Sequence, residues 1–203
     1  MVEPAQCALL LLAAGGSRRL GTPKQLVPVD GELLIQRAVR IALTAELRPT
    51  VVVLGAHAAE IRAHLEDQPV MLVENLQWKE GMASSIRTGL AVVLAEAPEA
   101  DGIVMMLADQ PQLTKEHVAA LLDAQRASGR DIVASHYGDH LGPPAYFGRR
   151  HFAALGELHG DVGARALLAN FDPLPVPMPR GVSADLDTPD DYSRLVESAR
   201  VKR

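Results

Sequence analysis

A glycine-rich, basic loop follows the first apolar segment of the chain. From Leu12 to Lys24 the spacing reads L-A-A-G-x-S-x-R-x-G-x-x-K. Glycines let backbone N–H groups approach an anion closely, while arginine and lysine supply rigid and flexible positive charge. The loop has the composition of a phosphate cradle, although a flexible strand-to-helix turn with solvated basic residues is the alternative. The candidate binding residues are Leu12, Ala13, Ala14, Gly15, Gly16, Ser17, Arg19 and Lys24.

The spacing of this loop excludes two familiar nucleotide-binding patterns. A Walker A loop requires G-x-x-x-x-G-K-[ST], and an ordinary dinucleotide fold requires G-x-G-x-x-G. Neither pattern fits residues 12–24. An ATPase P-loop and a standard dinucleotide-binding fold are therefore not indicated.

Asp109 follows an almost wholly apolar segment, GIVMMLA. A carboxylate at the end of a buried strand is costly to desolvate unless a cation meets it. Pro111 ends the strand, so that the Asp109 carboxylate faces the cleft. Mg²⁺ prefers one or two carboxylates together with phosphate oxygens, which makes Asp109 a candidate magnesium ligand. Capping of the next turn is the alternative.

A second acidic segment, SADLDTPDDY, lies near the other end of the chain. In an extended segment Asp185 and Asp187 point to the same face, so either can supply a second metal carboxylate. The run Asp-Thr-Pro-Asp-Asp is equally a good helix start, whose acids complement the helix dipole. Both interpretations stay open.

The segment NLQWKEGMASSIRTGL opens an apolar-periodic helix with small residues. The N-terminus of such a helix can face a cleft and donate backbone N–H groups to an anion. Gly81, Ser84 and Ser85 are the candidates, and a plain helix start is the alternative.

Short apolar segments alternate with amphipathic ones along most of the chain. This alternation predicts an α/β three-layer sandwich with a mostly parallel central sheet, similar to a Rossmann fold. Open parallel sheets bind ligands at the carboxyl ends of their strands, so the candidate residues are expected to share one cleft. The expected strands are 7–13, 50–54, 70–74, 102–107 and 131–135, and the expected helices are about 32–46, 57–67, 82–97 and 114–128.

The alternation ends after about residue 136, where GDHLGPPAYFGRR and FDPLPVPMPRGV carry many of the 14 prolines. Apolar residues between these prolines predict ordered loops and edge strands. His136 and His140 flank a glycine and an aspartate, which predicts a turn rather than a zinc pair. We expect one domain over 1–203, with a nucleotide-binding part at about 7–136 and an acceptor-side part at about 137–203.

Composition narrows the function classes. The 203 residues carry a net charge of −5 and dispersed basic residues, which argues against binding of a nucleic acid polymer. The apolar run at 8–14 follows an acidic residue and a proline and lacks the basic leader of a signal peptide, and it is too short for a bilayer span. We expect a soluble, cytoplasmic protein without membrane partners. Cys7, the one cysteine, is expected to be a small buried hydrophobe.

From Leu12 to Tyr192 the chain resembles the nucleotidyltransferase family that attaches nucleotides to molybdopterin cofactors and sugar phosphates. The resemblance implies that Arg19 and Lys24 hold the phosphates of a nucleoside triphosphate and that the 75–90 run lines its base and ribose. Asp-Gln-Pro at 109–111 is similar to the family's D-x-P metal motif. The D-x-D-T-P segment implies that Asp187 completes magnesium coordination, with Asp185 close by.

Two features of the resemblance concern the substrates. Ala14 stands where guanylyl-transferring relatives have a second glycine, which favours CTP over GTP. The late segment is similar to the acceptor side of the cofactor-nucleotidylating branch, although many relatives have Gly-His-Pro where this chain has Gly-Pro-Pro, which leaves the acceptor open. The alternative for Asp161 and Arg165, which lie four residues apart, is an ion pair on a helix, which stabilises the helix by about 0.2 to 0.5 kcal/mol. The acceptor-binding candidates are Gly142, Pro143, Asp161 and Arg165.

These features together predict magnesium-dependent nucleotidyl transfer, with Lys24, Arg19 and Asp109 as the catalytic residues. The expected reaction moves CMP from CTP to a molybdopterin-type cofactor, with a molybdoenzyme as a possible recipient. The alternatives are a cytidylyltransferase for a sugar phosphate or an isoprenoid precursor, an NAD(P)H-dependent oxidoreductase, and a non-catalytic molybdenum cofactor chaperone.

Overall fold

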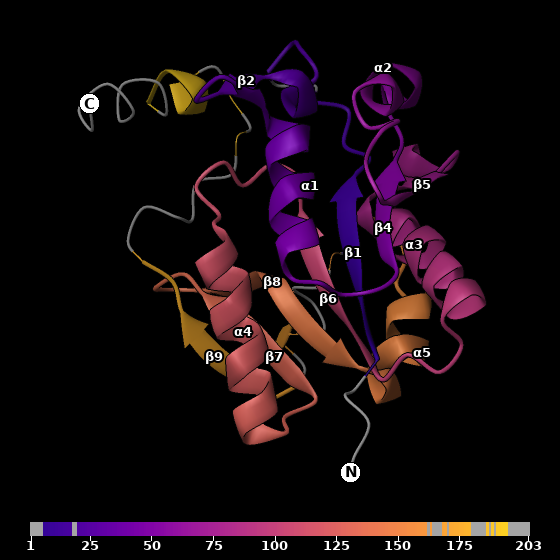
Figure 1. Cartoon of the computed structure of the whole chain (residues 1–203), viewed down its shortest axis with the longest axis vertical. Coiled ribbons are helices and arrows are strands. Elements are labelled where there is room, and N and C mark those ends of the chain that lie inside the picture. Colours follow the sequence, from indigo (N-terminus) through magenta and orange to yellow (C-terminus); the bar gives the residue numbers. More distant parts are fainter. Residues whose placement is uncertain are drawn as a thin grey trace.

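The computed structural model describes residues 6–17, 20–161, 163, 168–169, 171–179, 186, 188 and 190–194. Within these residues, seven strands form one sheet in the order β5-β4-β1-β6-β8-β7-β9 (Figure 1). β8 runs antiparallel to β6 and β7, and the other neighbouring pairs are parallel. The bounds are β1 Cys7–Ala13, β4 Thr50–Leu54, β5 Met71–Glu74, β6 Gly102–Leu107, β7 Ile132–His136, β8 Leu141–Gly148 and β9 Leu174–Pro177.

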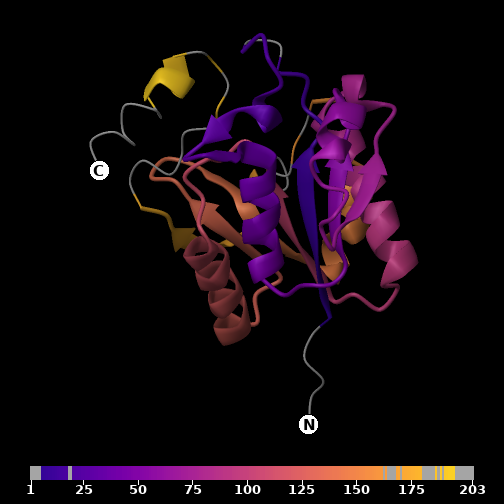
Figure 2. The ribbon, with the colours of Figure 1, turned by 45° about the horizontal axis from the view of Figure 1, so that its top comes forward.

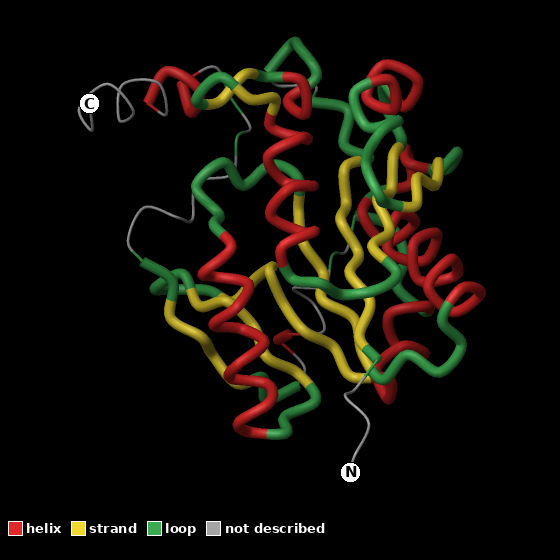
Figure 3. Tube along the Cα trace, in the orientation of Figure 1, coloured by secondary structure: helices red, strands yellow, loops and turns green. Residues whose placement is uncertain are grey.

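Helices cover both faces of the sheet, as Figures 2 and 3 show from two directions. α1 (Leu34–Thr44), α2 (Ala58–Ala63) and α4 (Lys115–Ser128) pack on one face, and α3 (Met82–Glu96) and α5 (Phe152–Gly156) pack on the other. Side chains of β1 alternate between the two cores, with Leu9 and Leu11 on the first side and Leu10 and Leu12 on the second. The expected three-layer sandwich is confirmed.

The segments predicted from apolar periodicity agree with the structure to within a few residues. β1, β4 and β6 have the predicted bounds, and β5 and β7 differ by one residue at one or both ends. Thr114 caps α4 through a capping box with His117, and Gly129 ends the helix at a φ of +62°. Apolar runs and helix signals in the sequence therefore predict most of the strands of the sheet and most of the helices that cover it.

The proline-rich segment at 141–148 departs from the expectation of loops and edge strands. It forms β8, which lies inside the sheet between β6 and β7. A register shift opposite Pro143 and Pro144 accommodates them, because Ala134 pairs with Ala145 whereas the next residue pairs with Gly142. β9, with Pro175 and Pro177, is the edge strand that such composition predicts. The expected turn between His136 and His140 is confirmed as the β7 to β8 connection.

A small hairpin lies outside the main sheet, formed by β2 (Pro28–Val29) and β3 (Glu32–Leu33). Val29 and Leu34 pack with Leu186, which is 1% exposed, in a third apolar cluster. Thr188 donates its backbone N–H and its hydroxyl to Asp191 Oδ2, at 2.8 and 2.7 Å, ahead of helical residues 190–194. The interpretation of the Asp-Thr-Pro-Asp-Asp run as a helix start is therefore confirmed at Thr188 and Asp191.

Cys7 begins β1 and packs partly buried against the first core. Burial raises the pKa of its thiol to about 12, so the thiol stays protonated at neutral pH. The structure thus agrees with a packing role for this residue. In the part of the chain that the structure describes, no helix is both long enough and apolar enough to cross a membrane.

Candidate active site

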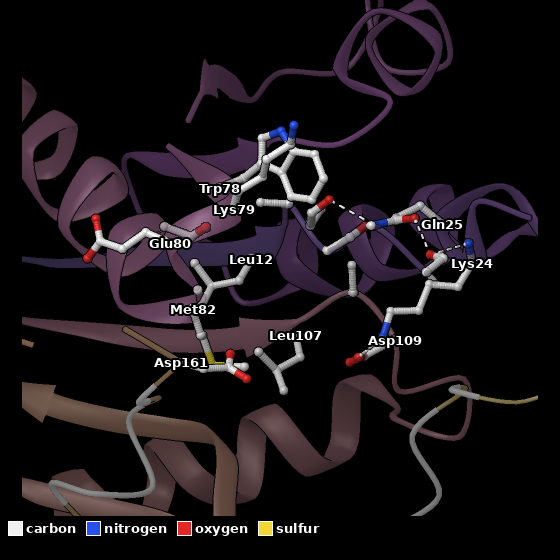
Figure 4. Close-up of a pocket in the computed structure, with 18 residues that line it drawn as sticks. Leu12, Lys24, Gln25, Trp78, Lys79, Glu80, Met82, Leu107, Asp109 and Asp161 are labelled. Atoms are coloured by element: carbon white, nitrogen blue, oxygen red, sulfur yellow. Dashed lines mark hydrogen bonds and ion pairs between the residues drawn. The ribbon is translucent and has the colours of Figure 1, made fainter. Parts of the chain in front are cut away.

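The candidate site lies where β1 and β6 end side by side. β1 leads through α1 to β4 on one side, whereas β6 leads through α4 to β7 on the other. Such a reversal of strand order opens a crevice at the carboxyl ends of the strands. A cavity of about 580 Å³ occupies it (Figure 4). Its lining residues are Leu12, Ala13, Ala14, Gly15, Gly16, Ser17, Lys24, Gln25, Trp78, Lys79, Glu80, Gly81, Met82, Ser85, Leu107, Ala108, Asp109 and Asp161.

The loop after β1 forms one wall of the cavity. Its backbone turns at Ser17, which has a φ of +49°. The Ser17 hydroxyl accepts a hydrogen bond from the backbone N–H of Lys24 at 2.8 Å. Lys24 begins a short 3-10 helix, η1 (Lys24–Leu26), so this bond ties the loop to the element that carries the lysine. Arg19, the other predicted phosphate ligand, lies outside the described residues.

Lys24 and Asp109 meet at the edge of the cavity. The Lys24 Nζ lies 2.5 Å from Asp109 Oδ2. The two side chains point toward one another in Figure 4. Both side chains are largely buried, at 14% and 18% exposure. A cation from the basic loop and a carboxylate from the end of β6, 85 positions apart in sequence, are thus paired in one place.

The second oxygen of Asp109 bears on the predicted metal. Asp109 Oδ1 is buried and has no hydrogen-bond partner among the described residues. An unpartnered buried carboxylate oxygen is costly and fits a bound cation. Among those same residues, no group of three or more His, Cys, Asp and Glu side chains is placed to hold a metal. Asp185 and Asp187, the other predicted ligands, lie outside them.

The C-terminal acidic segment nevertheless contacts the end of β6 through a described residue. The backbone N–H of Leu186 donates to the backbone carbonyl of Asp109 at 2.9 Å. Leu186 is anchored there by burial of its side chain in the third cluster. The residue between the two predicted acids in sequence is therefore bonded to the residue that bears the described carboxylate.

The N-terminus of α3 forms the wall opposite β6. Gly81 and Ser85 line the cavity. Ser84 does not, because its hydroxyl lies 2.8 Å from the Gly81 carbonyl and accepts from Asn75 Nδ2 at 2.8 Å. Asn75 is 2% exposed and also contacts Ser85 Oγ at 3.0 Å. Ser84 therefore holds the helix start together, while Gly81 and Ser85 face the cavity.

Trp78 is the largest cavity residue that was not among the sequence candidates. It begins the 3-10 helix η2 (Trp78–Glu80). A Cβ at Gly16 would lie 3.0 Å from its ring, and one at Gly55 would lie 2.7 Å from its Cβ. Two glycines thus allow the ring to approach the loop. The tryptophan belongs to the 75–90 run, which was the one sequence signal for it.

The late segment reaches the cavity at Asp161, which is exposed and lies next to Gly160. The Gly160 carbonyl accepts from the backbone N–H of Ala83 at 3.2 Å, which joins this turn to the start of α3. Arg87 strengthens the connection, because it pairs with Glu80 at 2.8 Å and donates to the Leu158 carbonyl at 2.5 Å. The turn that carries Leu158 and Gly160 is thereby held against the start of α3.

The contact between Gly81 and the 160–161 turn allows no side chain. Gly81 has a φ of +124°, and a Cβ there would lie 2.4 Å from the Gly160 carbonyl oxygen. We expect Gly81→Ala to destabilise the fold by about 3 kcal/mol, through backbone strain and overpacking together, and to lower Tm in thermal denaturation. Gly129→Ala is the matched control, because Gly129 also has a positive φ but open space around it. Equal losses in the two variants would contradict a packing constraint at Gly81.

Gly142 and Pro143, two of the other acceptor candidates, do not line the cavity. The Pro143 carbonyl accepts from Gln110 Nε2 at 3.1 Å and from the Tyr137 hydroxyl at 2.5 Å. Gly142 packs beside Tyr137, since a Cβ there would lie 3.6 Å from that ring. Arg165 lies outside the described residues. Of the four predicted acceptor residues, only Asp161 is described at the cavity.

The fold and the site define an α/β protein whose ligand cleft lies at the strand-order reversal and is lined by a glycine-rich loop, a lysine and a strand-end carboxylate. The sequence comparison identifies its family. Residues 9–174 match the MobA-like NTP transferase domain, and the chain belongs to this family of nucleotidyltransferases. The expected resemblance is confirmed.

Three curated relatives match most of the chain. It is 32% identical to the purine catabolism protein PucB of Bacillus subtilis, covering 92% of this chain and 94% of that protein. It is 34% identical to the nicotine blue oxidoreductase of Paenarthrobacter nicotinovorans, over 78% and 79%. It is 30% identical to the molybdenum cofactor guanylyltransferase of Rhodobacter capsulatus, over 94% and 95%. The names of these relatives indicate different functions although the family is shared.

A solved structure shares the same fold. Rv0371c from Mycobacterium tuberculosis superposes with a TM-score of 0.83 and 34% identity, covering 95% of this chain and 98% of that chain. A second structure of Rv0371c, in complex with manganese, gives a TM-score of 0.79 and 32% identity over 95% and 99%.

Proposed function

We propose that the chain is a magnesium-dependent nucleotidyltransferase that transfers CMP from CTP to a molybdopterin-type cofactor and releases pyrophosphate. The contact between Lys24 and Asp109 carries the proposal, because it joins the basic loop to a carboxylate that has one buried, unpartnered oxygen in the described structure. The cavity of about 580 Å³ beside this contact has the volume of a small-molecule site. Family membership supports the reaction class.

The proposed reaction is an in-line substitution at phosphorus. An acceptor phosphate oxygen attacks the α-phosphorus of the triphosphate, the bond to the bridging oxygen breaks, and pyrophosphate leaves with the bonding electrons. Such transfers ask little covalent chemistry of a protein, so catalysis rests on positioning and charge neutralisation. Lys24 and Arg19 are proposed to hold the phosphates and stabilise the charge that develops on them.

The proposed metal ligands are Asp109, Asp187 and Asp185. Asp109 fits a hard cation through its buried, unpartnered oxygen. The bond from the Leu186 amide to the Asp109 carbonyl supports the other two, since Leu186 lies between them in sequence. A Mg²⁺ ion bound there would neutralise phosphate charge during the transfer. The manganese complex of Rv0371c is consistent with a divalent metal in a related fold.

Substrate assignments beyond the family rest on single residues. Ala14 supports CTP over GTP, and Gly81, Ser84 and Ser85 are proposed at the base and ribose. Asp161 is the acceptor candidate that faces the cavity, and Gly142, Pro143 and Arg165 complete the proposed acceptor set. A sugar phosphate or an isoprenoid precursor is the alternative acceptor. We further propose a cytoplasmic, single-domain protein that can deliver its product to a molybdoenzyme.

One specific observation favours a second candidate function. The nicotine blue oxidoreductase relative is 34% identical to this chain, which supports NAD(P)H-dependent hydride transfer as the alternative reaction. That reaction does not need the carboxylates of a metal site. A hydride-transfer activity that persists in Asp109→Ala with EDTA would therefore support the oxidoreductase and contradict the nucleotidyltransferase.

Pyrophosphate release from the four nucleoside triphosphates, with magnesium, tests the proposal directly. We expect release with CTP only when molybdopterin cofactor is added, and its loss with EDTA. Release with a phosphorylated sugar or isoprenoid precursor instead would change the acceptor and keep the class. Cofactor binding without turnover of any triphosphate would identify a non-catalytic chaperone and overturn the proposed reaction.

A further inference from the structure

Gln25 is a buried polar residue beside the cavity that the proposed chemistry does not use. It follows Lys24 in η1 and is 1% exposed. Its Nε2 donates to the backbone carbonyls of Ala13 and Gly15, each at 2.9 Å. Its Oε1 lies 3.4 Å from the Ser17 hydroxyl, which donates to it. Every polar atom of this side chain is therefore bonded to the loop after β1.

These contacts determine which way the peptide groups of the loop point. In a trans peptide unit the C=O of one residue and the N–H of the next point in opposite directions. Because Gln25 binds the carbonyls of Ala13 and Gly15, the N–H groups of Ala14 and Gly16 point away from Gln25. Both residues line the cavity. The buried amide of Gln25 thus turns two backbone donors to the side of the loop away from its own side chain.

The intervening peptide unit is fixed from the opposite side. The Ala14 carbonyl accepts from the backbone N–H of Ala56 at 3.1 Å, on the loop that follows β4. Three successive carbonyls of the loop are therefore anchored, at residues 13, 14 and 15. The structure assigns no acceptor within the described residues to the amides of Ala14 and Gly16. Two anchored donors without an internal acceptor are suited to a ligand anion or base.

We infer that Gln25 is a positioning residue that holds the amides of Ala14 and Gly16 ready for the nucleotide. This inference rests on the proposed function and deepens it. Lys24 supplies positive charge to the loop after β1, and Gln25 holds the backbone of that loop in one conformation. A loop that is ordered before the ligand arrives spends less binding free energy on ordering itself.

The substitution Gln25→Met tests the inference, because methionine nearly preserves the volume and removes the amide. Trp78 is the one tryptophan of the chain and lines the cavity, so its fluorescence reports binding of CTP with Mg²⁺. We expect Kd for CTP with Mg²⁺ to rise between about tenfold and a hundredfold, since the three hydrogen bonds that order the loop are lost. Gln36→Met is the matched control, because Gln36 is more exposed and makes one 3.5 Å contact, to the His64 carbonyl.

Calorimetry separates positioning from loss of folded protein. A merely structural role lowers the number of binding sites per chain and leaves Kd unchanged, whereas positioning raises Kd of the folded protein. A Kd within twofold of the unaltered chain would overturn the inference and leave the proposed function standing. Absence of nucleotide binding by the unaltered chain would overturn both. If Gln25→Met does not fold, Gln25→Asn serves in the same titration, because its shorter side chain cannot reach both carbonyls.

Discussion

Asp109→Asn is expected to lower nucleotidyl transfer by about a hundredfold to a thousandfold, the size of effect that follows loss of one charge-stabilising group in an active site. Asparagine keeps the shape of the side chain but removes the charge that Lys24 contacts at 2.5 Å. It also puts a neutral amide in place of the carboxylate whose buried oxygen has no partner in the described structure. Pyrophosphate release at saturating CTP and Mg²⁺ measures the loss.

Asp101→Asn is the matched control for this prediction. Asp101 precedes β6, at the end of that strand opposite to Asp109, and accepts a hydrogen bond from the backbone N–H of Gln6 at 3.1 Å. The two substitutions remove the same charge from the two ends of one strand, so a general effect of net charge would appear in both. Near-normal turnover in Asp109→Asn would contradict the assignment of the metal site to the carboxyl end of β6.

Most of the fold follows from local signals in the sequence. β1, β4 and β6 are apolar on both faces, and this pattern alone predicts buried parallel strands with helices on either side. β8 could not be predicted, because prolines are normally excluded from interior strands. Its place depends on the register shift at Ala134 and Ser135 of the neighbouring strand. That register shift depends on how β7 and β8 pair, so it cannot be predicted from the sequence of either strand alone.

The candidate site divides in a similar way. Lys24, Asp109 and Gly81 were identified by residue type and spacing, and the structure brings them to one cavity. Gln25 was not identified, since a polar residue beside a lysine in a basic loop has the composition of a solvated turn. Only the path of the backbone shows that its side chain is buried beneath the glycines. Sequence patterns therefore indicate the groups that carry charge better than those that hold the backbone in place.

Lys24→Met is expected to have two opposite effects, on catalysis and on metal binding. A charge pair about 4 Å apart contributes roughly 4 kcal/mol at an effective dielectric of about 20, so loss of the ammonium is expected to slow transfer by about a hundredfold to a thousandfold. In the structure, however, the ammonium lies on the same carboxylate that is proposed to bind the metal. Removing it is expected to tighten Mn²⁺ binding by the nucleotide-free protein.

Electron paramagnetic resonance of free Mn²⁺, with and without CTP, measures the second effect. In the unaltered chain, CTP is expected to tighten Mn²⁺ binding strongly, because the phosphates draw Lys24 away from Asp109 as well as supplying ligands. In Lys24→Met that gain is expected to shrink, since the competing cation is already gone. Lys115→Met is the control, because Lys115 is 67% exposed on α4 and pairs with Glu116. Unchanged Mn²⁺ affinity of nucleotide-free Lys24→Met would mean that the metal does not bind at the carboxylate that Lys24 contacts.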